Sequence, residues 1–316
     1  DHAVTLARSR PIDGPYEVHP ENPLLTSRGA PDHPLQKAGH GSLVETQHGE
    51  WYLTHLVGRP VGPHRRCILG RETALQKCRW DADDWLRLAE GGCEPQLEVQ
   101  SPKLPAYPFQ PPPERNDFDL AMLPSEFQTL RVPSDDSWLS LTERPGWLRL
   151  RGRDSPASLH RHALVGRRIE ALNSRAVTKM EFQPRSYQQM AGLLAWYNSR
   201  KFFYLCQTFH EQRGSILEIV ASDDGRPEQV ALHDVSLAAG SSIWLSCRLQ
   251  EVVIQFGFST DGHRWQDFGP ELDATRLSDD YGHGFSFTGS FFALACHDLS
   301  GAGLHADFDW FEYRQT

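Results

Sequence analysis

The sequence predicts an all-β protein, with an incomplete β-propeller followed by a two-sheet sandwich. Aromatic residues make up 10% of the chain, and 25 Gly and 22 Pro supply frequent turns. Short apolar runs alternate with turn residues along nearly the whole chain, which is typical of many short strands. No stretch has the periodicity of a long amphipathic helix.

Charge and hydropathy exclude several classes of partner. With 32 Lys+Arg against 41 Asp+Glu, the net charge is −9, which is unfavourable for binding nucleic acid. No apolar run approaches the roughly 20 residues of a membrane span, so we expect no membrane partner. The first residues hold no apolar signal core and begin within a strand, so we expect a fragment of a cytoplasmic protein. No CxxC pair occurs, and we expect reduced thiols at Cys67, Cys78, Cys93, Cys206, Cys247 and Cys296.

Residues 2–88 are predicted to form propeller strands. A strand at 2–7 and a turn at Asp13, Gly14 and Pro15 precede an irregular loop at 20–34. Four strands of an antiparallel meander follow, at 41–46, 51–57, 68–80 and 85–88. Their spacing is that of propeller blades, of which about one and a half are visible. Because a closed ring needs at least about four blades, we expect an N-terminal propeller half to complete this region.

A proline-rich stretch between residues 91 and 116 predicts an extended connector. We therefore divide the chain into a propeller part with its linker at 1–113 and a sandwich domain at 114–316. Strand patterns return downstream at the close spacing of a jelly-roll sandwich. They lie at 147–153, 192–199, 202–211, 215–222, 242–250, 251–259, 287–297 and 306–313.

Three segments carry sequence motifs that indicate a family as well as a fold. LQKAGHGSLVET at 35–46, LGRETALQ at 69–76 and SDDYGHGFSFTGSFF at 278–292 resemble the C-terminal half of the family 43 glycoside hydrolases, most closely the two-domain β-xylosidases and α-L-arabinofuranosidases. Similarity at both ends of the chain extends this resemblance over essentially all 316 residues. The resemblance implies a five-bladed propeller and a concanavalin-like sandwich that helps to wall the substrate pocket.

The resemblance also implies where the catalytic groups lie. In the family, the general acid is a Glu in an EGP-type motif and the general base lies in an earlier blade. Neither motif occurs in this sequence. We therefore expect the acid and the base to lie upstream, and this chain alone to be inactive.

His40, in GHGS, is one of three candidate site residues. The resemblance makes it the central histidine of the pocket, close to a cation in the propeller axis or coordinating it, often through water. Calcium is the best candidate, because such a channel offers mainly oxygen ligands, and no organic cofactor is expected. The alternative is an ordinary structural histidine, facing solvent or held by a hydrogen bond.

Arg71, in GRETA, is the second candidate. Alternation in a strand would place Arg71 and Glu72 on opposite faces. The resemblance places Arg71 against the sugar, where its planar fork can hold two hydroxyls or lower the pKa of a neighbouring carboxylate. The alternative is a surface ion pair with Glu72 or its neighbours, and a role of Glu72 as catalytic acid is less favoured.

Phe287, in FTG, is the third candidate. The resemblance makes it the aromatic side chain that reaches from the sandwich to the pocket rim, where a sugar ring can stack on it. The alternative places it in the sandwich core, as we expect for Phe285, Phe291 and Phe292. The neighbouring pair Asp279 and Asp280 is predicted to form a turn or a solvated rim.

Other prominent residues receive structural interpretations. Asp307 and Asp309 alternate with apolar residues as in an edge strand, and we assign them no chemistry. Trp51, Trp80 and Trp85 are expected to pack between blades rather than to bind sugar. A basic cluster is expected at a solvated surface or an interface: Arg161, Arg167 and Arg168.

Together these expectations predict a glycosidase once the N-terminal half is present. It would cleave terminal β-1,4-xylosyl or α-L-arabinofuranosyl residues from xylo-oligosaccharides with inversion. One alternative is a non-catalytic carbohydrate-binding or assembly module. Another is a split enzyme, in which a separate chain supplies the missing half. Pentose preference and a homo-oligomeric state stay open.

Overall fold

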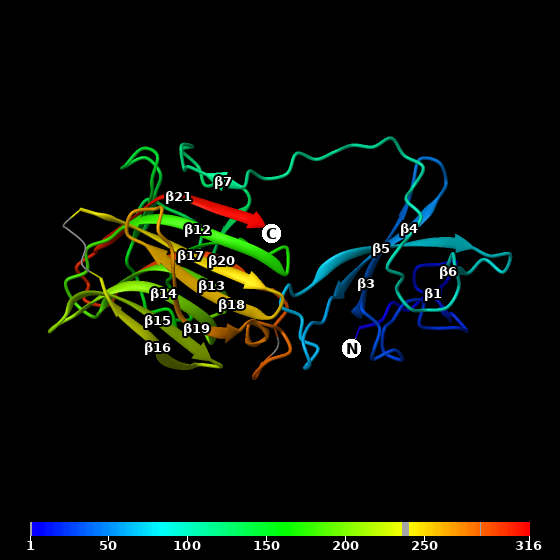
Figure 1. Ribbon diagram of the computed structural model, residues 1–316. Helices are drawn as coiled ribbons and strands as arrows, with labels where there is room; N and C mark the ends of the chain where they lie inside the picture. Colours follow the sequence, from blue (N-terminus) through cyan, green and yellow to red (C-terminus); the bar gives the residue numbers. More distant parts are fainter. Residues whose placement is uncertain (1, 236–239, 285) are drawn as a thin grey trace. The chain divides into compact units, whose positions relative to one another are not determined.

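The computed structural model describes residues 2–235, 240–284 and 286–316, and these residues are built almost entirely from β-strands (Figure 1). Within them the one helical element is a 3₁₀ turn, η1 (Ala274–Arg276). No helix of the described part has the length and apolar character to cross a membrane. The predicted all-β class is confirmed. The chain divides into two compact units, Asp1–Pro60 with Gly70–Gln110, and Val61–Leu69 with Pro111–Thr316.

The first unit contains a four-stranded antiparallel sheet in the order β3-β4-β5-β6, and a two-stranded pair, β1-β2. This is the predicted meander. A small apolar core, which includes Leu25, Leu53 and Leu86, holds the sheet together. The strands are β1 (Ala7–Arg8), β2 (Glu17–Val18), β3 (Gln36–Glu45), β4 (Trp51–Gly58), β5 (Glu72–Trp80) and β6 (Leu86–Leu88).

The bounds of β3 and β5 differ from those predicted. β3 begins five residues before the predicted strand at 41–46, because two register shifts against β4 absorb the irregular stretch from Gln36 to Ser42. β5 begins four residues later than predicted, at Glu72. Ile68 and Leu69, which we had placed in this strand, instead belong to the buried core of the second unit.

The second unit is a sandwich of two antiparallel sheets. One has the order β19-β18-β17-β12-β21-β10-β9, with β7 pairing to β21, and the other has the order β16-β15-β14-β13-β20-β11-β8. The strands are β7 (Arg115–Asn116), β8 (Phe127–Thr129), β9 (Leu139–Ser140), β10 (Leu148–Arg151), β11 (Ala163–Arg168), β12 (Asn173–Glu181), β13 (Gln189–Asn198), β14 (Lys201–His210), β15 (Gly214–Asp223), β16 (Arg226–Asp234), β17 (Ser242–Gln250), β18 (Val253–Ser259), β19 (Gln266–Asp273), β20 (Phe291–Asp298) and β21 (His305–Gln315).

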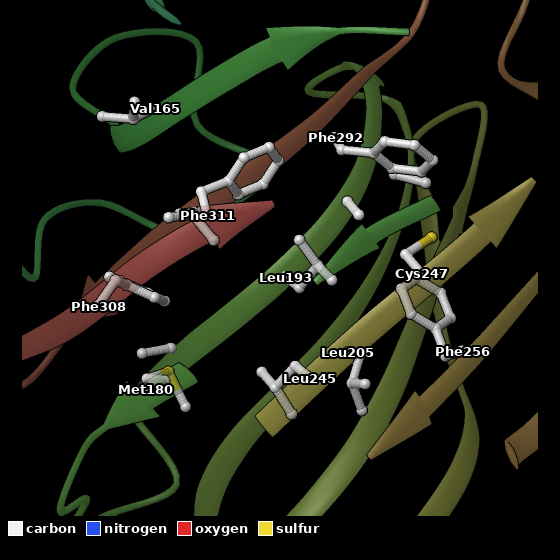
Figure 2. Close-up of a cluster of buried hydrophobic side chains, with 14 of the residues drawn as sticks. Val165, Met180, Leu193, Leu205, Leu245, Cys247, Phe256, Phe292, Phe308 and Phe311 are labelled. Atoms are coloured by element: carbon white, nitrogen blue, oxygen red, sulfur yellow. The ribbon is translucent and has the colours of Figure 1, made fainter. Parts of the chain in front are cut away.

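Alternating side chains from both sheets build the main core of this unit (Figure 2). On β17, for example, Leu245 and Cys247 point inward, and on the opposite sheet Leu193 and Leu205 do so. All the predicted sandwich strands are present within a few residues of their expected bounds. Seven strands of this unit were missed: β7, β8 and β9 are only two or three residues long, β11 ends in two arginines, and β12, β16 and β19 carry mostly charged or polar residues at their outward positions.

The interpretation of Asp307 and Asp309 as edge-strand residues is wrong. β21 lies between β12 and β10 in the interior of its sheet. Asp307 is buried and accepts hydrogen bonds from Arg149 and Arg144, while Asp309 pairs with Lys179 at 2.6 Å. Asp307 is therefore an internal ion-pair partner, held inside a polar cluster.

The solvated basic cluster is also corrected. Arg167 is buried, lies over the Tyr313 ring and donates a hydrogen bond to the Pro113 carbonyl. Arg168 is half-buried. Only Arg161 lies at the surface as expected, in a 3.2 Å ion pair with Asp154.

Tryptophans of the first unit pack within that unit. Trp51 and Trp80 make an edge-on contact with ring centroids 5.6 Å apart, and Trp85 is buried against His19. Packing of these rings between blades stays a prediction. The six cysteines are free thiols.

Candidate functional site

The local backbone around His40 is irregular. Lys37 and His40 both have positive φ, 60° and 53°, and β3 shifts register on each side of Gly39. A Cβ on Gly39 would lie 2.5 Å from the Cβ of His2 and 2.9 Å from the amide nitrogen of Ala3. Glycine is therefore required at this position, because the N-terminal segment passes directly against β3.

His40 lies inside β3 and is exposed. We had placed it just before a strand, so its position is corrected by the earlier start of β3. Its exposure leaves the ring accessible to a ligand.

Arg71 lies directly before β5 rather than in mid-strand, and it is half-buried. Glu72 does not serve as its ion-pair partner. The Glu72 carboxylate instead accepts two hydrogen bonds of 2.8 Å from Arg59. Glu72 is therefore held in a structural pair with Arg59 rather than in the position of a free acid, and a surface ion pair of Arg71 with a neighbour stays a prediction.

The structure brings Arg71 and His40 into one electrostatic environment. Burial lowers the pKa of His2, and the positive charges of Arg71, His40 and Lys37 lower it further. Arg71, His40 and Lys37 therefore each lie within charge range of His2. Sequence reasoning missed His2 and Lys37. The signal for Lys37 was its place in the same motif as His40.

This group can hold the hydroxyls of a neutral ligand or a carboxylate. Its side chains supply none of the six to eight oxygen ligands that a calcium ion takes, so those ligands would have to come from other groups or from water. Within residues 2–235, 240–284 and 286–316, no group of three or more His, Cys, Asp or Glu side chains could hold a metal ion. The calcium ion near His40 stays a prediction, and no chemical step below depends on it.

Phe287 lies in the second unit, in an irregular segment before β20, and is 45% exposed. Its alternative placement in the core is therefore wrong. Phe292 is buried in the main core as predicted, while Phe291 packs at the edge of a second cluster. Phe285 lies outside the described residues. Contact of Phe287 with a sugar stays a prediction.

Anchors directly after Phe287 hold the segment that contains it. Ser290 donates from its hydroxyl to the carbonyls of Ile68 and Leu277 at 3.1 and 2.7 Å. Arg168 donates to the Thr288 carbonyl. These bonds fix the backbone around Phe287 and leave its ring at the surface.

Asp279 and Asp280 form the predicted turn, and both carboxylates are used inside the unit. Asp279 accepts a 2.8 Å hydrogen bond from the Tyr197 hydroxyl, and Asp280 accepts a 2.9 Å bond from the Cys67 amide. Lys201 completes this arrangement with hydrogen bonds from Nζ to the carbonyls of Ser278 and Tyr281, and burial lowers the pKa of Lys201 to about 8. Nothing in the strand pattern indicated a buried lysine.

The first unit contains a concavity of about 780 Å³, which is lined by charged residues of the β5–β6 hairpin and the N-terminal loop. Its carboxylates are held in ion pairs, since Arg87 binds Asp83 and Glu21, and Arg79 binds Asp81. These pairs leave no carboxylate placed as a general acid or base.

Comparison with known proteins agrees with this architecture. Residues 115–314 match the family described as the β-xylosidase C-terminal concanavalin A-like domain, and residues 1–86 match glycosyl hydrolases family 43. A xylan 1,3-β-xylosidase from a Vibrio species is 43% identical over 99% of this chain and 60% of its own length. A putative β-xylosidase from Escherichia coli K12 is 41% identical over 99% of the chain and 61% of its own.

A solved structure is similar as well. The crystal structure of a xylan β-1,4-xylosidase from Bacillus halodurans superposes with a TM-score of 0.95 at 47% identity, and covers 99% of this chain and 60% of that one. The two units and their strand order define an all-β architecture with a sandwich domain. The chain belongs to glycosyl hydrolases family 43, with the concanavalin A-like C-terminal domain of its β-xylosidases. It spans about 60% of the length of the curated relatives that it matches.

Proposed function

We propose that the protein to which this chain belongs is an exo-acting glycoside hydrolase. Its substrates are xylo-oligosaccharides with terminal β-1,4-xylosyl residues, and terminal α-L-arabinofuranosyl residues are also accepted. Support comes from relatives whose names include β-xylosidase and non-reducing end α-L-arabinofuranosidase. The observation that carries the proposal is that the charges of Arg71 and His40 both act on His2, within the family 43 part of the chain.

In this proposal the chain binds and orients the sugar, and the acid and base come from upstream blades. The guanidinium of Arg71 donates to two hydroxyls of the terminal sugar, and the exposed ring of His40 forms part of the same surface. Hydrolysis proceeds with inversion. The acid and the base lie about 6.5–9.5 Å apart, which leaves room for a water molecule between the base and the sugar.

Kinetics of the full-length enzyme test the role of Arg71. Removing two charge-assisted hydrogen bonds by Arg71→Ala should lower kcat/KM on an aryl β-xyloside by roughly 100-fold. Arg59→Ala is the matched control, because Arg59 pairs with Glu72 nearby and has no proposed sugar contact. An unchanged kcat/KM in Arg71→Ala would refute the subsite.

The stereochemistry is tested separately by proton NMR of the first product. Inversion predicts α-xylose as the initial anomer from a β-xyloside. Binding of xylotriose by the full-length protein without any hydrolysis would instead support the carbohydrate-binding module.

A further inference from the structure

The second unit contains a pocket that none of the predicted site residues lines. It has a volume of about 170 Å³ and lies on the face of the seven-stranded sheet that is turned away from the main core. Apolar side chains of Leu130, Leu164, Trp196 and Phe291 form much of its wall. Because drug-sized ligand sites start at about 300 Å³, this pocket has room for one small ring.

Strand register explains why the sheet is hollow here. Arg168 on β11, Phe291 on β20 and Trp196 on β13 are direct cross-strand neighbours and form one row of large side chains. The next row on the same face begins with Gly166, which pairs with Ala293. A Cβ on Gly166 would point to this face, 3.4 Å from the Phe291 side chain. The small residues Gly166 and Ala293, beside the large side chains of the first row, produce the concavity.

Arg168 supplies the charge of the pocket. Its guanidinium lies 4.7 Å from the Phe291 ring centroid and donates to the Thr288 carbonyl. Burial lowers the pKa of Arg168, which means that its charge is partly desolvated. The charge of the Glu170 carboxylate opposes this shift, without a salt bridge to Arg168 within the described residues. A partly desolvated cation is costly, and an anionic ligand in direct contact with it would offset that cost.

Three features thus define the ligand: room for one ring, aromatic and aliphatic walls, and an arginine fork at one end. We propose that this pocket binds a single sugar ring that carries a carboxylate, with the ring face against Phe291 and the carboxylate on Arg168. The inference rests on the proposed function only for the choice of a sugar as the ligand class. The pocket would recognise an acidic substituent of a saccharide at a site other than the Arg71 group.

Saturation-transfer NMR on the present chain tests the proposal, with D-glucuronate and D-xylose as probes. D-Glucuronate should bind saturably and more tightly than D-xylose, because only D-glucuronate supplies a carboxylate to the arginine. Arg168→Met should weaken D-glucuronate binding by roughly tenfold or more, as expected for loss of a charge-assisted pair. The assay needs no hydrolysis, so its outcome is independent of the enzymatic proposal.

Two further variants serve as a surface control and as a test of the pocket itself. Arg161→Met is the matched control, since Arg161 is exposed and pairs with Asp154, and it should bind as the parent does. Leu130→Trp should fill the pocket and abolish binding while the guanidinium stays in place. Equal binding of D-xylose and D-glucuronate, no loss in Arg168→Met, or absence of saturable binding to the parent chain would each overturn the proposal.

Discussion

At the scale of single residues, buried polar groups of the sandwich determine how its stability depends on pH, and strand patterns did not reveal them. His297 on β20 is completely buried, and its Nδ1 lies 2.6 Å from the Asp154 carbonyl. Because a carbonyl only accepts, Nδ1 carries a proton, so the neutral ring is the Nδ1–H tautomer. Burial lowers the pKa of His297 to about 4.

The lowered pKa of His297 predicts that the folded state becomes less stable as the pH falls. The unfolded chain binds a proton near pH 6.5, whereas folded His297 binds one only near 4, so stability is complete above pH 6.5 and decreases as the pH falls toward 4. The loss should reach about 3 kcal/mol. Urea unfolding between pH 4 and 6.5 should show that the free energy of unfolding depends less steeply on pH in His297→Asn than in the parent. The side-chain amide of the variant can still donate to the Asp154 carbonyl. The exposed control His160→Asn should keep the parent's slope, and an equal slope in His297→Asn would contradict the assignment.

Asp307 gives a second prediction at this scale. Burial raises its pKa, but hydrogen bonds from Arg149 and Arg144 and the charge of Arg149 outweigh burial and hold the pKa below its ordinary value. Asp307→Asn removes the buried carboxylate that Arg144 and Arg149 share, leaving them only their more exposed partners Glu181 and Glu143, and should cost about 3 kcal/mol at pH 7. The difference from the parent should shrink as the pH falls through the lowered pKa, because Asp307 is then protonated in both states.

Urea unfolding at pH 7 and at acid pH measures both parts of this prediction. Asp309→Asn is the matched control on the same strand. Its pair with Lys179 is more exposed, so the change should cost less than about 1 kcal/mol. Equal effects of the two substitutions would show that burial of Asp307 does not matter.

At the scale of elements, the position of β21 is the main difference from the expected fold. This last strand pairs with β12 on one side and with β10 and β7 on the other, and Phe308 and Phe311 on it are fully buried in the main core (Figure 2). An edge strand could fray without loss of the sheet. An interior strand cannot, because both of its neighbours lose their hydrogen-bond partner.

Deletion of residues 305–316 should therefore abolish folding of the second unit. Near-UV circular dichroism should show loss of the aromatic signal. Deletion of residues 314–316 alone should cost less than about 1 kcal/mol, because these three residues are exposed. A folded second unit in the longer deletion would show that β21 is dispensable.

At the scale of the whole molecule, the two units cannot be separated by cutting the chain at one point, because each contains two segments of the sequence. Residues Val61–Leu69 lie in sequence between β4 and β5 of the first unit but belong to the second. There Ile68 is fully buried, and its carbonyl accepts bonds from both the amide and the hydroxyl of Ser290. The Cys67 amide and the Arg66 guanidinium add bonds to Asp280 and Thr275.

Ile68→Ala should therefore destabilise the second unit, although the residue lies in the sequence of the propeller part. Loss of the buried side chain should cost about 3 kcal/mol. Hydrogen exchange should show reduced protection in β11 and β20, with β3 to β6 unchanged. Val44→Ala, at an exposed position of β3, should change neither. Reduced protection confined to the first unit would contradict this assignment.

The sequence alone determined the all-β class, most strands and the family, because alternation and turn residues are local signals and the motifs around His40, Arg71 and Phe287 are distinctive. Only the tertiary structure decided that β21 is internal, that Arg167 and His297 are buried, and that residues 61–69 cross to the other unit. Strand order, burial and the pairing of charges depend on contacts between residues far apart in the chain, and no local pattern encodes them.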